Sequence, residues 1–130
     1  MLVLSGEAWD AVRTHSGVVG ASEACGLLLG DRAGPRVRVV AARPARNLAP
    51  DPARGYVLDP GDWLAAYREA ELAGLDLVGY YHSHPDGSGI PSAEDLAGAW
   101  PDHYYLIVTG SASAFLVQEG KARLVPVVVE

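Results

Sequence analysis

The sequence has a single cysteine, Cys25, and no long hydrophobic run. One cysteine cannot form a disulfide within the chain, which fits a reducing compartment. The longest apolar runs, such as Leu27–Leu29 and Val125–Val129 with Pro126 inside it, are far shorter than the roughly 18 residues of a membrane-spanning helix. The first residues also lack the basic stretch and apolar core of a secretory signal. We therefore expect a cytoplasmic protein with no membrane partner.

Basic residues are scarce as well. The chain has 10 lysines and arginines against 16 aspartates and glutamates, which gives a formal net charge of −6. Proteins that hold phosphate backbones carry an excess of positive charge, so we expect no nucleic-acid partner. With 49% hydrophobic residues, the chain has enough apolar side chains for a folded core. Its length of 130 residues is typical of one domain, and we expect a single domain over residues 1–130.

Apolar runs alternate with glycine and proline along the whole chain, without internal repeats. Apolar spacing and capping signals predict helices over Glu7–His15, Pro60–Leu72 and Ser92–Ala99. Alternating or continuous apolar runs predict strands at Leu2–Leu4, Ala24–Leu29, Arg36–Ala42, Tyr56–Leu58, Leu75–Tyr81, His103–Thr109, Ser113–Gln118 and Lys121–Val129. The intervening turns and loops are predicted at Gly30–Pro35, Pro44–Arg54 and His82–Pro91. This order predicts an α/β domain with helices packed on a mixed sheet.

The segment from residue 79 to residue 95 contains a possible metal site. If the strand stays extended through His84, alternation places the imidazoles of His82 and His84 on one face, about 6.5–7 Å apart along the backbone. Asp95, at the start of the next helix, can bring a carboxylate back to them across a glycine-containing loop. Two imidazoles and one carboxylate leave a fourth zinc position open for water, as a catalytic zinc site requires.

Each half of this pattern has a simpler interpretation. Ser92 and Asp95 have the spacing of a capping box, in which both side chains satisfy amides of the first helical turn. The two histidines alone could form a solvated strand end. Their occurrence together with a proline, a glycine loop and a helix-start carboxylate within fourteen residues favours the metal site.

The same residues resemble the signature of the JAMM, or MPN-plus, metallopeptidases. The chain reads His82-Ser83-His84-Pro85, then six residues, Ser92, two residues and Asp95, which matches that signature throughout. Upstream, Ser22–Gly30 resembles the Glu-x-Cys-Gly-Leu segment of the small, stand-alone bacterial members. The resemblance implies a single-domain MPN fold, similar to that of cytidine deaminases, with a mixed sheet or partial barrel and about three packed helices.

The resemblance also implies a role for each residue of the motif. His82, His84 and Asp95 would hold one catalytic Zn²⁺ per chain, and Glu23 would be the general acid/base on the zinc-bound water. The Ser92 hydroxyl would steady the developing oxyanion. Without the resemblance, Glu23 reads as a solvated or helix-dipole carboxylate, so its role depends on the family. Cys25 is expected to be a small packing residue in an apolar strand rather than a nucleophile or ligand.

As a substrate, the resemblance implies a ubiquitin-fold sulfur carrier or small modifier protein. Members of the family cleave peptide or isopeptide bonds after the C-terminus of such proteins, and the short bacterial and archaeal members act on tails that end in Gly-Gly. A chain of 130 residues has little room for the insertions of the polyubiquitin-specific members. We expect a monomer or homodimer.

Two other functions are alternatives to a metallopeptidase. A non-catalytic MPN-type scaffold would have lost ligands or the glutamate, whereas this chain keeps the whole set. A zinc nucleobase deaminase needs a Pro-Cys-x-x-Cys ligand pair, which one cysteine excludes.

The segment between Arg32 and Arg54 contains six arginines and a single acidic residue, Asp51. If these arginines share a face, they could steer an acidic carrier toward the site. A solvated hairpin face is the alternative.

The remaining polar candidates have weaker support. Ser83 is expected to orient the loop, and His15 and His103 belong to no recognised motif.

Overall fold

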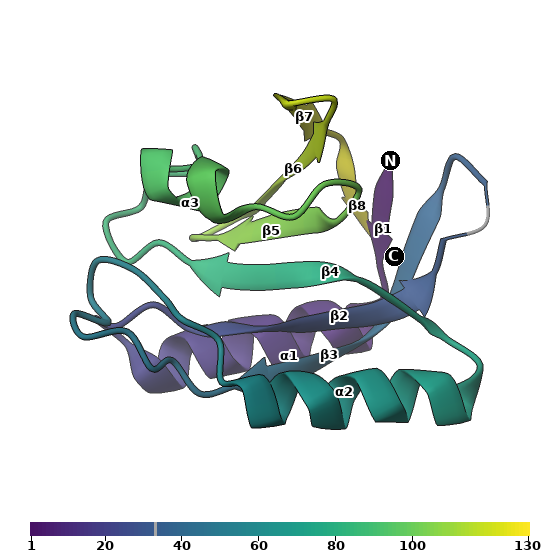
Figure 1. Ribbon diagram of the computed structural model, residues 1–130, viewed down its shortest axis with the longest axis horizontal. Coiled ribbons are helices and arrows are strands. Elements are labelled where there is room, and N and C mark those ends of the chain that lie inside the picture. Colours follow the sequence, from purple (N-terminus) through teal and green to yellow (C-terminus); the bar gives the residue numbers. More distant parts are fainter. Residues whose placement is uncertain (33) are drawn as a thin grey trace.

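The computed structural model describes residues 1–32 and 34–130 and contains, over that part of the chain, eight strands and three helices (Figure 1). The helices are α1 (Gly6–Val19), α2 (Pro60–Ala73) and α3 (Ala93–Gly98). The strands are β1 (Leu2–Leu4), β2 (Cys25–Asp31), β3 (Val37–Ala45), β4 (Asp76–Ser83), β5 (Tyr104–Val108), β6 (Ala112–Gln118), β7 (Lys121–Val125) and β8 (Val127–Val129). The predicted α/β domain with three helices on a mixed sheet is therefore confirmed.

The strands form one mixed sheet in the order β7-β6-β5-β4-β2-β3-β1-β8. β4 lies in the middle of this order, antiparallel to β2 and parallel to β5. β8, the strand at one edge of the sheet, contacts β6, which lies next to the opposite edge. The sheet is therefore nearly closed. β4 is thus supported on both edges, and the residues at its C-terminal end are held by two neighbouring strands.

The two long helices cover opposite faces of the sheet. Because successive side chains of a strand point to opposite faces, neighbours such as Leu27 and Leu28 belong to different clusters. Leu28 packs with Ala8 and Val12 of α1, whereas Leu27 packs with Ala66 of α2. His82 in β4 and His84 directly after it alternate with the same phase as Tyr80. Because Tyr80 packs against the cluster under α2, the candidate site lies on the α2 side of the sheet.

Both long helices begin at capping residues that the sequence identifies. The Ser5 side chain accepts a hydrogen bond from the Ala8 amide, and the Asp59 side chain accepts one from Gly61 at the start of α2. α1 continues one turn past the predicted end at His15 and stops at Gly20, which has a φ of 61°. His15 is therefore inside the helix, not at its end.

Three of the strand predictions were wrong. β4 does not stop at Tyr81 but continues through His82 to Ser83, because pairing with β2 and β5 continues to that point. Tyr56–Leu58 is not a strand; only Leu58 forms an isolated bridge, with Asn47. The last predicted strand is divided at Pro126 into β7 and β8, which pair with different partners.

Two further boundaries also moved. β3 runs on to Ala45, through Pro44 and into the predicted loop. Of the predicted turn at residues 30–35, Gly30 and Asp31 belong to β2, and Ala33 lies outside the described residues. Within the described residues, no helix has both the length and the apolar character needed to cross a membrane.

Gly79 brings β4 and β5 close together. A Cβ atom at Gly79 would lie 1.9 Å from the Tyr104 carbonyl oxygen, a distance that no real side chain tolerates. The glycine therefore allows the backbone approach that places His82 beside Ile107 in the parallel ladder.

Candidate functional site

His82 and His84 lie at the C-terminal end of β4, where the strand is still held on both sides. The His84 amide donates to the Val108 carbonyl at 3.0 Å, and the Ser83 amide donates to the Ala24 carbonyl at 2.9 Å. The Ser83 hydroxyl accepts from the Ala24 amide at 2.8 Å, so its function is to tie β4 to the start of β2. The backbone therefore stays extended, and both imidazoles point to the same side.

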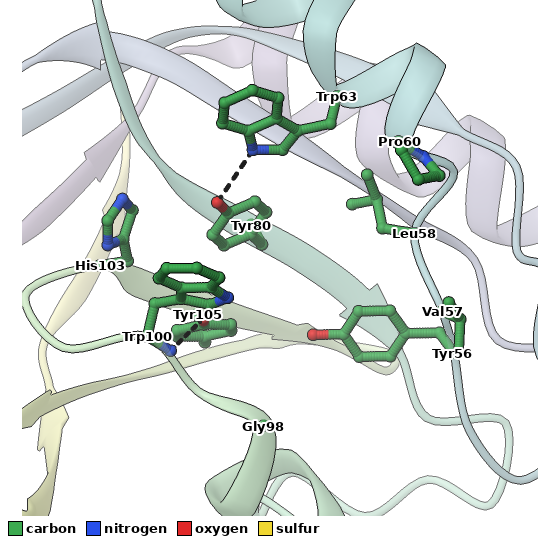
Figure 2. A pocket seen from close by; sticks show the side chains of 10 residues that line it. All are labelled: Tyr56, Val57, Leu58, Pro60, Trp63, Tyr80, Gly98, Trp100, His103 and Tyr105. Atoms are coloured by element: carbon green, nitrogen blue, oxygen red, sulfur yellow. Dashed lines mark hydrogen bonds between the residues drawn. The ribbon is translucent and has the colours of Figure 1, made fainter.

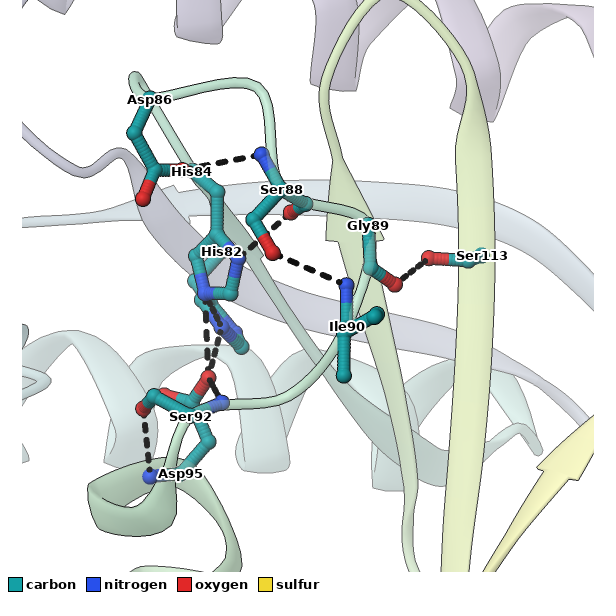
Figure 3. A network of polar contacts seen from close by, with 9 residues as sticks. All are labelled: His82, His84, Asp86, Ser88, Gly89, Ile90, Ser92, Asp95 and Ser113. Carbon is teal, nitrogen blue, oxygen red and sulfur yellow. Dashed lines mark hydrogen bonds and ion pairs between the residues drawn. The ribbon is translucent and has the colours of Figure 1, made fainter.

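Asp95 reaches the two histidines from the first turn of α3 (Figure 3). Ser92 caps this helix: its hydroxyl accepts from the Asp95 amide, and Asp95 Oδ2 accepts from the Ser92 amide at 2.9 Å. The capping box predicted as the simpler interpretation is therefore present. It does not compete with the site, because the oxygen that accepts the capping bond also lies beside the imidazoles.

Three donor atoms of these side chains form a compact triangle. His82 Nε2 and His84 Nε2 are 3.0 Å apart, and Asp95 Oδ2 lies 3.2 Å from the first and 3.0 Å from the second. Ligands placed 2.0–2.1 Å from a tetrahedral zinc ion would be about 3.3 Å apart. The donor set and its spacing fit a zinc ion with only a small expansion.

The ring nitrogens of His84 have different partners. Nδ1 lies 2.7 Å from the Ser88 carbonyl oxygen, which only accepts, so Nδ1 carries the hydrogen. In the neutral ring this leaves the Nε2 lone pair directed at His82 and Asp95, which is the tautomer a metal ligand needs. The Ser88 carbonyl is held by a turn in which the Ser88 amide donates to Asp86.

His82 is fixed by packing. It has no exposed surface, and its Nδ1 has no hydrogen-bond partner among the described residues. The Tyr56 ring stacks on the imidazole with ring centroids 4.7 Å apart and planes 25° from parallel. No sequence pattern indicates this contact, because Tyr56 lies in an irregular segment 26 positions before His82.

Glu23 lies two residues before the start of β2, and only 7% of it is exposed. Donor atoms of Glu23, His82 and His84 all lie within 4.8 Å of one another. Glu23 Oε1 has no hydrogen-bond partner within the described part of the chain. Burial raises the pKa of this carboxyl to about 7, although the nearby His84 opposes the rise. An acid with this pKa can both take up and release a proton near neutral pH.

Asp95 has the opposite electrostatic environment. Burial disfavours its charged form, but the hydrogen bond from His82 and the charges of both imidazoles hold its pKa well below the usual range. The pKa values of the two carboxyl groups of the site are thus shifted in opposite directions. Pairs of this kind are typical of sites that combine a charged ligand with acid/base chemistry.

A loop between β3 and α2 holds Glu23 in place. The side-chain amide of Asn47 donates to the backbone carbonyls of Glu23 and Gly55, both at 3.0 Å, and its oxygen accepts from the amides of Ala49 and Val57. The Glu23 amide donates to Pro52 at 2.7 Å. The role of Asn47 could not be predicted, since a lone asparagine in a proline-rich loop forms no recognisable pattern.

The remaining candidates lie outside the cluster. Cys25 is fully buried, its Sγ faces the carbonyls of Ala45 and Arg46, and burial raises its pKa to about 12, as suits a packing residue. His15 Nδ1 is 2.7 Å from the Tyr81 hydroxyl on the α1 side of the sheet. His103 contacts the Pro101 carbonyl.

The six arginines between residues 32 and 54 do not form a free basic surface. Their partners are Glu130 for Arg36 and Arg38, Glu69 for Arg43, Asp59 and Asp62 for Arg46, Asp51 for Arg54, and the Asp102 carbonyl for Arg32. The charge that is segregated in the sequence is therefore balanced in space.

A family match and two related proteins agree on the kind of protein that this chain resembles. Residues 6–123 match the family described as prokaryotic homologs of the JAB domain. The chain is 40% identical over 111 residues to a desampylase of Haloferax volcanii, an alignment that covers 82% of this chain and 78% of the relative. It is 35% identical over 113 residues to a probable TtuB-protein conjugate cleaving protease of Thermus thermophilus, covering 86% and 73% of the two chains.

Solved structures agree with this result. The solution structure of a protein from Desulfitobacterium hafniense superimposes with a TM-score of 0.90 at 28% sequence identity, covering 100% of this chain and 93% of the other. A protein from Salinibacter ruber gives a TM-score of 0.67 at 31% identity, covering 100% and 92%.

Proposed function

Because the chain belongs to the family of prokaryotic homologs of the JAB domain, we propose that it is a zinc-dependent hydrolase of the small JAMM type. Its substrates would be conjugates of ubiquitin-like proteins or sulfur carriers, cut after a C-terminal Gly-Gly. The observation that carries the proposal is the convergence of two imidazoles and one carboxylate beside a buried glutamate of raised pKa.

We assign His82, His84 and Asp95 as the metal ligands. The Nε2 atoms of both histidines and Oδ2 of Asp95 converge on a common point, and their separations of 3.0–3.2 Å are close to those around a tetrahedral zinc ion. Imidazole nitrogen and carboxylate oxygen are the donors of catalytic zinc sites with three protein ligands. When bound, zinc would supply Lewis acidity, which polarises a carbonyl and lowers the pKa of water.

Glu23 is not counted among the ligands, although its donor atom belongs to the same cluster. Its buried Oε1, which has no hydrogen-bond partner among the described residues, can accept a proton from the attacking water and return it to the leaving amine. The bond that breaks is an amide bond, and its leaving nitrogen needs that proton because an amine anion is a poor leaving group. A glutamate that ionises near pH 7 can act in both directions.

Ser92 would stabilise the negative charge that develops on the carbonyl oxygen. Its hydroxyl oxygen accepts the capping bond from Asp95, so its hydrogen stays available for donation. The residue is exposed and lines the same cleft as Glu23. Capping would thus fix the direction of the donor before substrate arrives.

The substrate class follows from the relatives. A desampylase of Pyrococcus furiosus, 38% identical over 113 residues, bears the same name as the Haloferax protein, and the Thermus protein is named for cleavage of TtuB–protein conjugates. The chain covers more than two thirds of the length of each. We infer that this chain acts on conjugates of the same kind.

The test is to incubate the zinc-loaded protein with Gly-Gly-ending ubiquitin-fold proteins of its host, each joined to a C-terminal peptide or to a lysine. Intact mass should show release of the carrier ending in Gly-Gly. Chelation should stop the reaction, and added zinc should restore it. Glu23→Gln should retain zinc and lose activity by about 10²–10⁴-fold. An intact conjugate in the presence of stoichiometric zinc would indicate a binding scaffold instead.

A further inference from the structure

A second cavity, lined mostly by aromatic rings, lies next to the candidate metal centre (Figure 2). It has a volume of about 670 Å³. Tyr80 and Tyr105, neighbours on β4 and β5, lie on one side, with Trp63 of α2 and Trp100 of the α3–β5 loop beside them. Tyr56 lines the side of the cavity that leads to His82.

The polar atoms of these aromatic residues are largely satisfied within the wall. Trp63 Nε1 donates to the Tyr80 hydroxyl at 3.2 Å, and the Trp100 amide donates to the Tyr105 hydroxyl at 2.7 Å. None of the described residues that line the cavity carries a carboxylate, ammonium or guanidinium group. Ring faces and aliphatic groups, with the Tyr56 hydroxyl and the His103 imidazole as the polar exceptions, are left for an occupant, so the cavity suits a mainly apolar side chain.

The distance to the metal centre matches two residues of extended chain. Tyr80 precedes His82 by two positions on β4 and lies on the same face, which corresponds to about 7 Å. A Gly-Gly segment in extended conformation spans the same distance and has no side chains to place. The residue before the two glycines would therefore be the first whose side chain reaches the aromatic cavity.

A separate polar cleft identifies the side on which the leaving group lies. This cleft of about 510 Å³ is lined by Glu23, His84, Ser92 and Arg54, among others. Glu23 must reach the leaving amine to protonate it, so the leaving group occupies the polar cleft. The acyl side of the scissile bond, which is the carrier's tail, then points toward the aromatic cavity.

We propose that the aromatic cavity binds the side chain that precedes Gly-Gly in the carrier tail and selects a large apolar residue there. The proposal rests on the proposed hydrolase function and adds a substrate preference to it. Trp100 contributes an accessible wall: it is 66% exposed, so its replacement should alter the cavity without loss of the core. The same exposure lets the occupant cover apolar surface that water otherwise contacts.

The first test uses peptides acetyl-Xaa-Gly-Gly joined to the ε-amine of a blocked lysine, with Xaa as leucine, phenylalanine, glycine, aspartate or arginine. Leucine or phenylalanine should raise kcat/KM by about 10- to 100-fold over glycine, the range expected for burying one apolar side chain. Aspartate and arginine should not exceed glycine. Equal rates across the series, or a preference for arginine, would overturn the pocket assignment while leaving the hydrolase intact.

The second test separates the pocket from catalysis. Trp63 and Trp100 line the cavity, so binding of the tripeptide acetyl-Leu-Gly-Gly to the zinc-loaded protein should change tryptophan fluorescence, and acetyl-Gly-Gly-Gly should bind more weakly by a similar factor. Trp100→Ala should remove most of the leucine preference in binding and in turnover. Leu124→Ala, on β7 and also 66% exposed, is the matched control and should keep it.

These readouts fail in different ways. If neither the peptides nor the carrier conjugates are cleaved but the leucine tripeptide still binds selectively through Trp100, the pocket assignment stands and the hydrolase proposal fails. If cleavage proceeds and Trp100→Ala keeps the full leucine preference, the pocket assignment is wrong.

Discussion

Replacement of Glu23 by glutamine should make the metal-free protein more stable at alkaline pH, although the same change abolishes the proposed catalysis. Glu23 is buried, and Oε1 has no hydrogen-bond partner in the described part of the chain. Burial raises the pKa of this carboxyl from 4.5 to about 7. The folded state therefore binds the proton more tightly than the unfolded state. The contribution of this carboxyl to stability is fully present below pH 4.5 and is lost as the pH rises through about 7.

The size of the effect follows from the two pKa values. A rise from 4.5 to about 7 corresponds to about 3 kcal/mol above pH 7, because a tenfold change in proton affinity is about 1.4 kcal/mol. Glu23 lines an open cleft, and solvent screening reduces the expected gain for Glu23→Gln to about 1–2 kcal/mol at pH 8.5. Near pH 5 most of this gain should disappear, because folded Glu23 is then protonated and neutral like glutamine.

Urea unfolding in the presence of a chelator, at pH 5 and pH 8.5, measures the difference. Glu71→Gln, on the exposed surface of α2, is the control and should change stability by less than about 0.5 kcal/mol at either pH. If Glu23→Gln destabilises the protein, or stabilises it equally at both values, the carboxyl is not held in the unfavourable environment described here.

Three other substitutions test separate parts of the structure. His84→Ala should abolish stoichiometric zinc binding, measured by metal analysis after dialysis, whereas His103→Ala should leave it intact. Gly79→Ala should cost about 2–4 kcal/mol in urea unfolding, since its Cβ would overlap the β5 backbone, and Gly110→Ala, with open space around it, should cost little. Ser92→Ala should lower turnover by about 10²-fold and Ser92→Thr should restore much of it, because only threonine keeps the donor and the cap; equal loss in both variants would exclude the hydroxyl from the reaction.

The part of the site that could be predicted consists of residues close together in the sequence. His82, His84 and Asp95 lie within fourteen residues, and strand alternation followed by a helix N-terminus is enough to bring them together. Ser92 was correctly placed next to Asp95 by the capping spacing. The approach of Glu23 depends on the antiparallel pairing of β2 with β4, between residues nearly sixty positions apart, and only the family resemblance indicated it.

What the sequence missed depends on tertiary contacts. The loop predicted from residue 82 begins later, because β2 and β5 continue to bind the β4 backbone where glycine and proline signals suggested an end. β3 tolerates Pro44 because its short neighbour β1 pairs only with Val37–Val39, which leaves the proline nitrogen on an unpaired edge. No sequence pattern links Tyr56 with Trp100, so the aromatic cavity forms only when three separate segments fold together.

X-ray absorption spectroscopy of the protein loaded with one equivalent of zinc tests the central claim most directly. The structure predicts nitrogen and oxygen ligands alone at about 2.0–2.1 Å, with the scattering signature of two imidazoles. Loss of one imidazole contribution is expected in the metal remaining bound to His84→Ala at saturating zinc. A sulfur ligand at about 2.3 Å would indicate Cys25 instead and would contradict a centre built from His82, His84 and Asp95.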